Sequence, residues 1–294
     1  MPGSTLDLPA FCCTNCGFWQ RYFDVPPDCP VCTDYRHPLP ADGWSFWTAD
    51  EVDRRVEVTW CEVLPDLWMF TATPGIGIGS CGFLVVREEG NIVFEGCGWY
   101  SDAALDQVES LGGVRWLAYS HAHVQGALWR LAERFRPEVV CHTEQLPTAQ
   151  ALPVAWPFDD RADLGDGAAL LHTGGHTPGH SVLYLADRRM LFCGDALKYK
   201  LDAAPVGRPL AVSTHKAYDA HIPLTHDDMR RYRDLFAGLD VEMVVTPWEV
   251  VPEGGLPLAL AMLDAQAARR PSADWFAADT HTFVPDDHFD PAHV

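Results

Sequence analysis

The chain has 294 residues, and its 41 acidic side chains outnumber 21 basic ones, which gives a formal charge of −20. A surface this acidic repels phosphate backbones and anionic lipid headgroups, so the composition argues against a nucleic-acid or membrane partner. Apolar residues make up 48% of the sequence and charged residues 21%, which is typical of a globular protein and excludes a disordered one.

The sequence shows neither a membrane-spanning segment nor a secretory signal. The longest nearly uncharged apolar stretch, residues 76–86, is far shorter than the roughly 20 residues that cross a bilayer. The first residues contain no basic segment followed by an apolar core, as a secretory signal would. We therefore expect a cytoplasmic protein with no membrane span.

The first motif in the chain is a pair of CxxC knuckles. Cys13 and Cys16 are followed, after twelve intervening residues, by Cys29 and Cys32. A segment this short buries too little apolar surface to fold alone, and a tetrahedral four-cysteine metal site would supply the missing stability. We predict a small metal-binding module over residues 1–44 and one larger domain over residues 45–294. The aromatic residues Trp44, Phe46 and Trp47 are expected to dock the module onto that domain.

Beyond residue 45, short β-rich runs alternate with helical patterns. Strands are predicted at residues 56–60, 67–71, 83–87, 92–95, 116–119, 139–141, 170–172, 182–186, 190–193 and 243–246. Helices are predicted at residues 102–111, 125–135, 227–237 and 258–269. Cys12 adjoins the first CxxC pair. The other five cysteines lie within apolar segments, and we expect them to be small buried hydrophobic residues: Cys61, Cys81, Cys97, Cys141 and Cys193.

Possible metal ligands follow three of the predicted strands. His121 and His123 come directly after an apolar strand, His176 lies in a glycine-rich GGHTPGH loop, and Asp195 follows a strand through one glycine. Loops at strand ends can hold ligands near a common point because the sheet behind them is rigid. Three imidazoles and one carboxylate suit Zn²⁺ or Fe²⁺, and the ligand types alone do not choose between the two metals.

The order and spacing of these motifs closely resemble the metallo-β-lactamase superfamily over nearly all of residues 55–270. That resemblance implies an α/β fold, a four-layer αββα sandwich with its metal site at one edge of two facing sheets. It also implies the metal ligands His121, His123 and His176, with Asp195 at the bridging position. His180 is expected to orient the His176 loop from behind.

Many members of this superfamily bind a second metal ion through an Asp and a His of an HxHxDH motif and through a final His. In this chain Gln125 stands in place of that Asp, Gly126 in place of that His, and Trp248 about where the final His is expected. The resemblance therefore implies a single catalytic ion. In hydrolytic members the motif Asp deprotonates the attacking water. Gln125, which stands in its place, cannot accept a proton at neutral pH, so this chain lacks that base.

Other residues could complete the pocket. His215 and Tyr218 lie in the segment where members of the superfamily place substrate-contacting loops, and Gln125 retains hydrogen-bonding capacity. The N-terminal knuckles resemble those of rubredoxin-like modules, which implies zinc or iron bound by Cys13, Cys16, Cys29 and Cys32. We favour a structural zinc there, with electron transfer as the alternative.

These patterns lead to one principal hypothesis, a hydrolase with a single catalytic metal acting on a small ester, thioester, lactone or amide. Two alternatives stay open. The first is a mononuclear non-heme iron enzyme, resembling persulfide dioxygenases, that uses the same ligands. The second is a non-catalytic binding protein with a degenerate metal site. The expected partner is a small-molecule substrate, and the sequence leaves open whether the chain forms a homo-oligomer.

Overall fold

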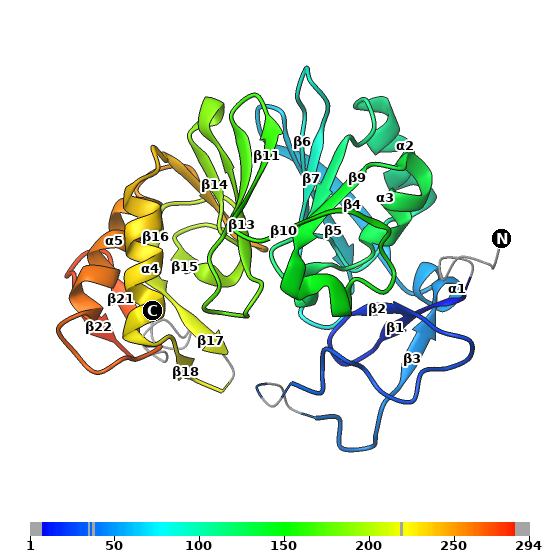
Figure 1. Ribbon diagram of the computed structural model, residues 1–294, viewed down its shortest axis with the longest axis horizontal. Coiled ribbons are helices and arrows are strands. Elements are labelled where there is room, and N and C mark those ends of the chain that lie inside the picture. The colour runs from blue at the N-terminus through cyan, green and yellow to red at the C-terminus, as the bar shows by residue number, and fades with distance from the viewer. Residues whose placement is uncertain (1–7, 35, 37–38, 218–219, 286–294) are drawn as a thin grey trace. The chain divides into compact units, whose positions relative to one another are not determined.

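The computed structural model describes residues 8–34, 36, 39–217 and 220–285. Its contacts divide the chain into two compact units, Met1–Asp160 and Arg161–Val294. Each unit contains one large β-sheet and a pair of longer helices (Figure 1). Among the residues that the structure describes, every helix is too short or too polar to span a bilayer.

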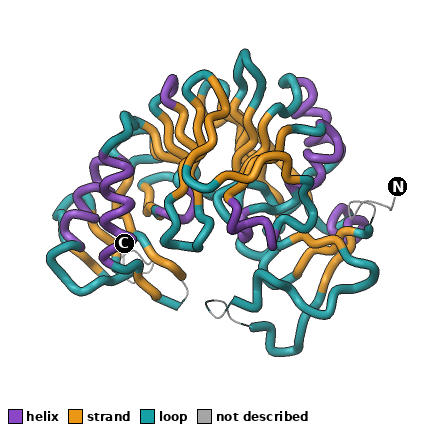
Figure 2. Tube along the Cα trace, viewed as in Figure 1, coloured by secondary structure: helices purple, strands orange, loops and turns teal. Residues whose placement is uncertain are grey.

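The first unit begins with the cysteine module, which is mostly loop (Figure 2). Its short antiparallel strands pair in the order β2-β1-β3, with β1 at Ala10–Cys13, β2 at Trp19–Arg21 and β3 at Phe46–Thr48. A tight turn links β1 to β2, since the amides of Cys13 and Gly17 donate to Phe18 and Cys13. The short helix α1 (Ala49–Asp53) follows β3 and begins with a capping box between Thr48 and Glu51.

The large sheet of the first unit has the strand order β10-β9-β8-β7-β6-β5-β4. Neighbours from β4 to β7 run antiparallel and those from β7 to β10 run parallel. The strands are β4 (Glu57–Leu64), β5 (Leu67–Thr73), β6 (Gly82–Val85), β7 (Ile92–Phe94), β8 (Trp116–Ala118), β9 (Glu138–His142) and β10 (Val154–Phe158). Parallel neighbours need crossover connections. Helix α2 (Asp102–Ser110) connects β7 to β8 and helix α3 (Leu128–Phe135) connects β8 to β9, whereas β9 is joined to β10 through the 3-10 turn η3 (Thr143–Thr148). Both helices pack their apolar side chains into the core on one face of the sheet (Figure 1).

The second unit is built around the sheet β11-β12-β13-β14-β19-β20. Its strands are β11 (Arg161–Gly165), β12 (Ala168–His172), β13 (Ser181–Leu185), β14 (Met190–Phe192), β19 (Met243–Val245) and β20 (Val250–Val251). A smaller sheet has the order β15-β16-β21-β22, formed by β15 (Lys198–Leu201), β16 (Pro209–Ser213), β21 (Trp275–Ala277) and β22 (Phe283–Val284). The strands β17 (His215–Ala217) and β18 (Ile222–Pro223) pair separately, and helices α4 (His226–Ala237) and α5 (Gly255–Gln266) share the core of this unit.

An aromatic cluster ties the cysteine module to the rest of the first unit. The Trp19 ring stacks on Trp99 with centroids 5.4 Å apart and lies 5.4 Å from Trp129. The Trp19 indole also donates a hydrogen bond to the Gly98 carbonyl at 3.2 Å. Buried aromatic pairs of this kind add about 0.5–1.5 kcal/mol each beyond their area. Of the three aromatic residues predicted to dock the module, Trp47 packs against the same core, whereas Trp44 and Phe46 pack against the cysteine cluster.

Two expectations from the sequence need correction. The helix predicted from residue 125 begins only at Leu128, because Gly126 has a left-handed φ of 46° that interrupts the helical backbone. Cys61 is exposed on the edge strand β4, whereas Cys81, Cys97, Cys141 and Cys193 are buried as expected. The exposure of Cys61 follows from its place on a strand that has a neighbour on one side alone.

Candidate metal centre

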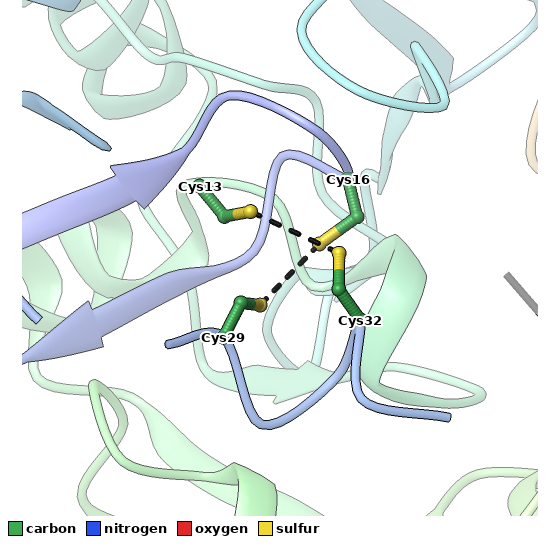
Figure 3. A group of neighbouring side chains, drawn as sticks. All are labelled: Cys13, Cys16, Cys29 and Cys32. Carbon is green, nitrogen blue, oxygen red and sulfur yellow. Dashed lines mark hydrogen bonds between the residues drawn. The ribbon is translucent and has the colours of Figure 1, made fainter. Parts of the chain in front are cut away.

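The four cysteines of the knuckles form a compact sulfur cluster. Their side chains point toward one another from the two loops (Figure 3), and their sulfur atoms all lie within 4.8 Å of one another. The Sγ atoms of Cys13 and Cys32 are 3.8 Å apart, and those of Cys16 and Cys29 are 3.7 Å apart. A tetrahedral site with Zn–S bonds of about 2.3 Å requires a sulfur–sulfur separation of about 3.8 Å. The cluster therefore has the dimensions of a four-cysteine metal site and lies well outside disulfide distance.

The surroundings of the cluster suit bound thiolates. All four cysteines are buried, and the Asn15 side-chain amide donates to the Cys32 sulfur at 3.3 Å. Hydrogen bonds from the other three sulfurs, that of Cys16 foremost, hold the pKa of the Cys13 thiol far below its ordinary value, whereas the hydrogen bond with Cys13 raises the pKa of Cys16. One thiol of the cluster therefore ionises at the expense of its neighbours, and since thiolates are the metal-binding form of cysteine, the predicted module can hold a metal ion.

The histidine pair of the first unit lies where strand β8 ends. His121 is extended and directly precedes the 3-10 turn η2 (Ala122–Val124), which contains His123. Both histidines are buried, and their ring centroids are 5.3 Å apart. The His121 Nδ1 atom lies 2.9 Å from the Ser120 hydroxyl. A hydrogen bond at Nδ1 leaves the opposite ring nitrogen, Nε2, as the metal-binding atom.

A buried glutamate that we did not single out from the sequence supports this pair. The Glu95 carboxylate accepts a hydrogen bond of 3.0 Å from the Ser120 amide, directly before His121. Glu95 is 1% exposed and has a left-handed φ of 63°, a conformation that costs a non-glycine residue about 1 kcal/mol or more. The signal in the sequence was an acidic residue at the end of an apolar strand, and strain of this kind is commonly stored near functional sites.

Gln125 and Gly126 occupy the positions where the resemblance would place a metal-binding Asp and His. The buried Gln125 side-chain amide donates a hydrogen bond to the Thr148 carbonyl at 3.3 Å. Gln125 therefore stabilises the neighbouring 3-10 turn η3 (Thr143–Thr148). At Gly126 a Cβ atom would lie 2.1 Å from the Cys97 carbonyl oxygen, closer than real Cβ contacts come. No side chain fits at position 126 without movement of the backbone.

The second unit brings His176 and Asp195 together. The His176 Nε2 atom lies 3.4 Å from the Asp195 Oδ2 atom, and both residues are buried. Two ligands of one tetrahedral zinc, with bonds of about 2.0–2.1 Å, lie about 3.4 Å apart, so this spacing fits a shared ion. The opposite His176 nitrogen, Nδ1, lies 3.1 Å from the His215 carbonyl oxygen, which leaves Nε2 for the metal.

His180 holds these two residues in place from behind. Its Nε2 atom accepts a hydrogen bond from the Asp195 amide at 3.1 Å, and its Nδ1 atom lies 2.6 Å from the Thr173 hydroxyl. Its carbonyl accepts hydrogen bonds from the amides of Thr173 and Gly174, which closes the loop that carries His176. Burial, with a smaller contribution from the neighbouring His176, lowers the pKa of His180 to about 3, so His180 stays neutral.

The charges around Asp195 favour its ionised form. Burial is the largest influence and opposes ionisation, but the positive charge of Lys198 and contributions from His176 lower the pKa of Asp195 to about 2. Lys198 itself lies over the Trp248 ring, with Nζ 4.4 Å from the ring centroid. Position 248 is thus occupied by an aromatic ring that already faces a cation.

His215 and Tyr218 are the two remaining candidate pocket residues. His215 is buried, and its ring centroid lies 6.4 Å from that of His176. Burial, aided by the charge of Lys198, holds the pKa of His215 well below its ordinary value, so the ring is neutral at physiological pH. Tyr218 lies outside the described residues.

A model of the metallo-beta-lactamase superfamily matches residues 74–248, more than half of the chain. The chain belongs to the metallo-beta-lactamase superfamily. Its two units, each a sheet with helices, correspond to the αββα fold class predicted above, and the four-cysteine cluster is consistent with a zinc-ribbon-like module added to it.

Individual relatives are distant. The uncharacterized protein YmaE of Bacillus subtilis is 25% identical over 184 residues, which cover 60% of this chain and 66% of that protein, slightly less than two thirds of its length. The mono-zinc form of the metallo-beta-lactamase FIM-1 from Pseudomonas aeruginosa superimposes with a TM-score of 0.52 at 15% identity, covering 73% of this chain and 98% of FIM-1. The flavodiiron protein from Giardia intestinalis superimposes with a TM-score of 0.53 at 15% identity, covering 72% of this chain and 60% of the flavodiiron protein. Identities this low establish the fold alone.

Proposed function

We propose that this protein is a hydrolase with one catalytic metal ion, held by His121, His123, His176 and Asp195, and that it acts on a small ester, thioester, lactone or amide. The observation that carries the proposal is the spacing of His176 Nε2 and Asp195 Oδ2, 3.4 Å, within a network that fixes both groups. The three histidines each offer one buried ring nitrogen to such an ion.

Three of the four proposed ligands are oriented or kept charged by neighbouring residues of this chain. The Ser120 hydroxyl and the His215 carbonyl hold the Nδ1 atoms of His121 and His176, so both rings present Nε2. The low pKa of Asp195 keeps its carboxylate charged over the physiological range, which is the form that binds metal. Neutral imidazoles and one carboxylate suit either Zn²⁺ or Fe²⁺.

When bound, a zinc ion at this site supplies a Lewis acid and lowers the pKa of a coordinated water to about 7. The chain's own residues then determine how protons are handled. Gln125 can orient a water or substrate through hydrogen bonds, but its amide cannot act as a base. His215 is neutral and binds a proton weakly because of burial and Lys198, so a proton that it accepts is readily released.

Three features support one ion rather than two. The Gln125 amide is engaged with Thr148, the backbone at Gly126 has no room for a side chain, and Trp248 faces the Lys198 ammonium. None of these positions offers a metal ligand of the type that a second ion requires. The proposed site is therefore mononuclear.

The proposed substrate is a small molecule in the cytoplasm. The formal charge of −20 disfavours polyanionic macromolecules, yet a metal cation dominates the field of its own pocket, so small anionic substrates are compatible with the acidic surface.

Hydrolysis of a panel of small esters, thioesters, lactones and amides by the full-length zinc-loaded protein tests the proposal. At least one class should be hydrolysed by the wild-type protein, and Asp195→Asn should abolish that activity. The exposed Asp187→Asn serves as a matched control that should leave it unchanged. Activity that survives in Asp195→Asn would contradict the assigned ligand set.

Metal identity separates the alternatives. Iron with visible absorbance in protein purified without added metal, together with oxygen consumption on thiol substrates, would favour the mononuclear iron enzyme. Metal in the cysteine cluster alone, with the histidines empty, would favour the non-catalytic binding protein.

A further inference from the structure

The turn that carries the histidine pair is part of the wall around the cysteine cluster. Ala122, which separates His121 from His123, packs in one apolar cluster with the four cysteines, Phe18 and Val31. Ala122 is 9% exposed, and the cysteines beside it are at most 3% exposed. The residue between the two candidate ligands thus contacts the module that carries the other candidate metal site.

A second contact joins the knuckle to the main body of the first unit through the backbone. Gly77 has a left-handed φ of 59°, and a Cβ atom there would lie 1.9 Å from the Cys16 carbonyl carbon. The loop at residue 77 therefore fits against the knuckle only because it has no side chain at this position. Backbone packed directly on backbone leaves little freedom for either partner.

A third route runs through the segment after strand β7. The Trp19 indole of the module donates to the Gly98 carbonyl, and two residues earlier the Gly96 amide donates to the Val124 carbonyl of turn η2 at 2.7 Å. The Ala127 amide also donates to the Cys97 carbonyl at 2.9 Å. The same short segment thus holds the cysteine module on one side and the histidine turn on the other.

We propose that metal bound by Cys13, Cys16, Cys29 and Cys32 positions the His121–His123 turn, so that filling the cysteine site strengthens metal binding at the histidine site. A module of this size depends on its metal to fold. Without the metal, the wall that Ala122 and Gly77 contact loses its rigidity. The inference rests on the proposed function, because it assumes that His121 and His123 are ligands.

The size of the effect follows from comparable cases. Removing groups that orient metal ligands commonly weakens metal affinity by about 10- to 100-fold. Coupling between two binding sites is reciprocal, so the histidine-site ion strengthens binding at the cysteine site by the same factor. The cysteine residues are thus positioning residues for the histidine site.

The test compares Cys32→Ser with Cys12→Ser in the full-length protein. Cys12 is a buried neighbour of the cluster whose thiol donates to the Cys13 carbonyl and is not among the four ligands, so it is a matched control. Cobalt(II) binding is followed by visible absorption, in which cobalt–thiolate charge-transfer bands distinguish the cysteine site from the histidine site. Affinity at the histidine site should fall about 10- to 100-fold in Cys32→Ser and stay unchanged in Cys12→Ser.

Hydrogen exchange supplies a readout that does not depend on metal at the histidines. The amides of Val124 and Gln125, which donate within turn η2 at 3.3 and 3.4 Å, should exchange faster in Cys32→Ser, while amides of strand β13 in the second unit keep their wild-type rates. Unchanged exchange in η2 together with unchanged cobalt affinity would overturn the inference.

A second pair of variants decides the matter if Cys32→Ser unfolds globally, which faster exchange in β13 would reveal. Ala122→Gly removes the methyl group that packs on the cluster, and Ala151→Gly is the control, since Ala151 is buried in the main core instead and takes no part in the three contacts above. The inference predicts weaker cobalt binding at the histidines in Ala122→Gly alone, and equal affinity in the two variants would overturn it. If wild-type protein with a filled cysteine site binds no cobalt at the histidines, the proposed function fails instead.

Discussion

Substitution of Gly126 tests the steric argument for a single ion. The Cβ atom of Gly126→Ala would lie 2.1 Å from the Cys97 carbonyl oxygen and 2.7 Å from that of Gly96. Relieving such a contact costs about 1–3 kcal/mol, as in other overpacked cores. The left-handed backbone, with φ at 46°, adds about 1–2 kcal/mol for a residue with a side chain. We therefore expect Gly126→Ala to lower the free energy of unfolding by about 2–5 kcal/mol.

The assay is urea unfolding of wild type, Gly126→Ala and the control Gly43→Ala. Gly43 also has a left-handed φ, 81°, but a Cβ atom there would meet nothing within 4 Å. The control therefore reports backbone strain alone, about 1–2 kcal/mol, and the difference between the two variants reports the collision. If the two variants lose the same stability, the backbone yields easily, and steric exclusion of a ligand at position 126 is wrong.

The remaining predictions concern metal content and pH. Gln125→Asp combined with Gly126→His restores the superfamily's pattern, yet equilibrium dialysis should find no additional ion; uptake of a further ion per chain would show that these two positions alone had blocked the second site. Asp195→Asn should lose the histidine-site metal and retain the metal of the cysteine cluster, and unchanged total metal content would contradict the ligand assignment. The pKa of His180 is about 3 in the fold against 6.5 in the unfolded chain, so the unfolded chain binds the extra proton between these values. The unfolding free energy of metal-free protein should therefore fall as pH drops from 6.5 toward 3, by at most about 1.4 kcal/mol per pH unit from this residue, and an equally steep fall in His180→Gln would refute that origin.

The sequence predicted the elements that carry chemistry better than those that hold them in place. The strand-end positions of His121, His176 and Asp195 could be inferred, because ligands of a rigid sheet follow its apolar strands. The four-cysteine cluster was equally clear from its spacing, since few other structures require two CxxC pairs so close together.

What could not be predicted depends on contacts between distant segments. Glu95 supports the histidine turn through the Ser120 amide, a hydrogen bond across 25 residues that no local pattern reveals. The hydrogen bond from Trp19 to the Gly98 carbonyl, which anchors the module, spans 79 residues and could not be predicted for the same reason. From the sequence, Gly126 was seen only as the absence of a ligand. In the fold, its backbone lies so close to the Cys97 carbonyl that no side chain fits at this position.

The most direct test of the account is a count of metal ions per chain in full-length protein under native conditions, by mass spectrometry that preserves bound metal. The account predicts one ion in the cysteine cluster and one at the histidine site, with His121→Ala losing the second and keeping the first. Two ions beyond the one in the cluster, or a wild-type count equal to that of His121→Ala, would contradict the single catalytic metal centre.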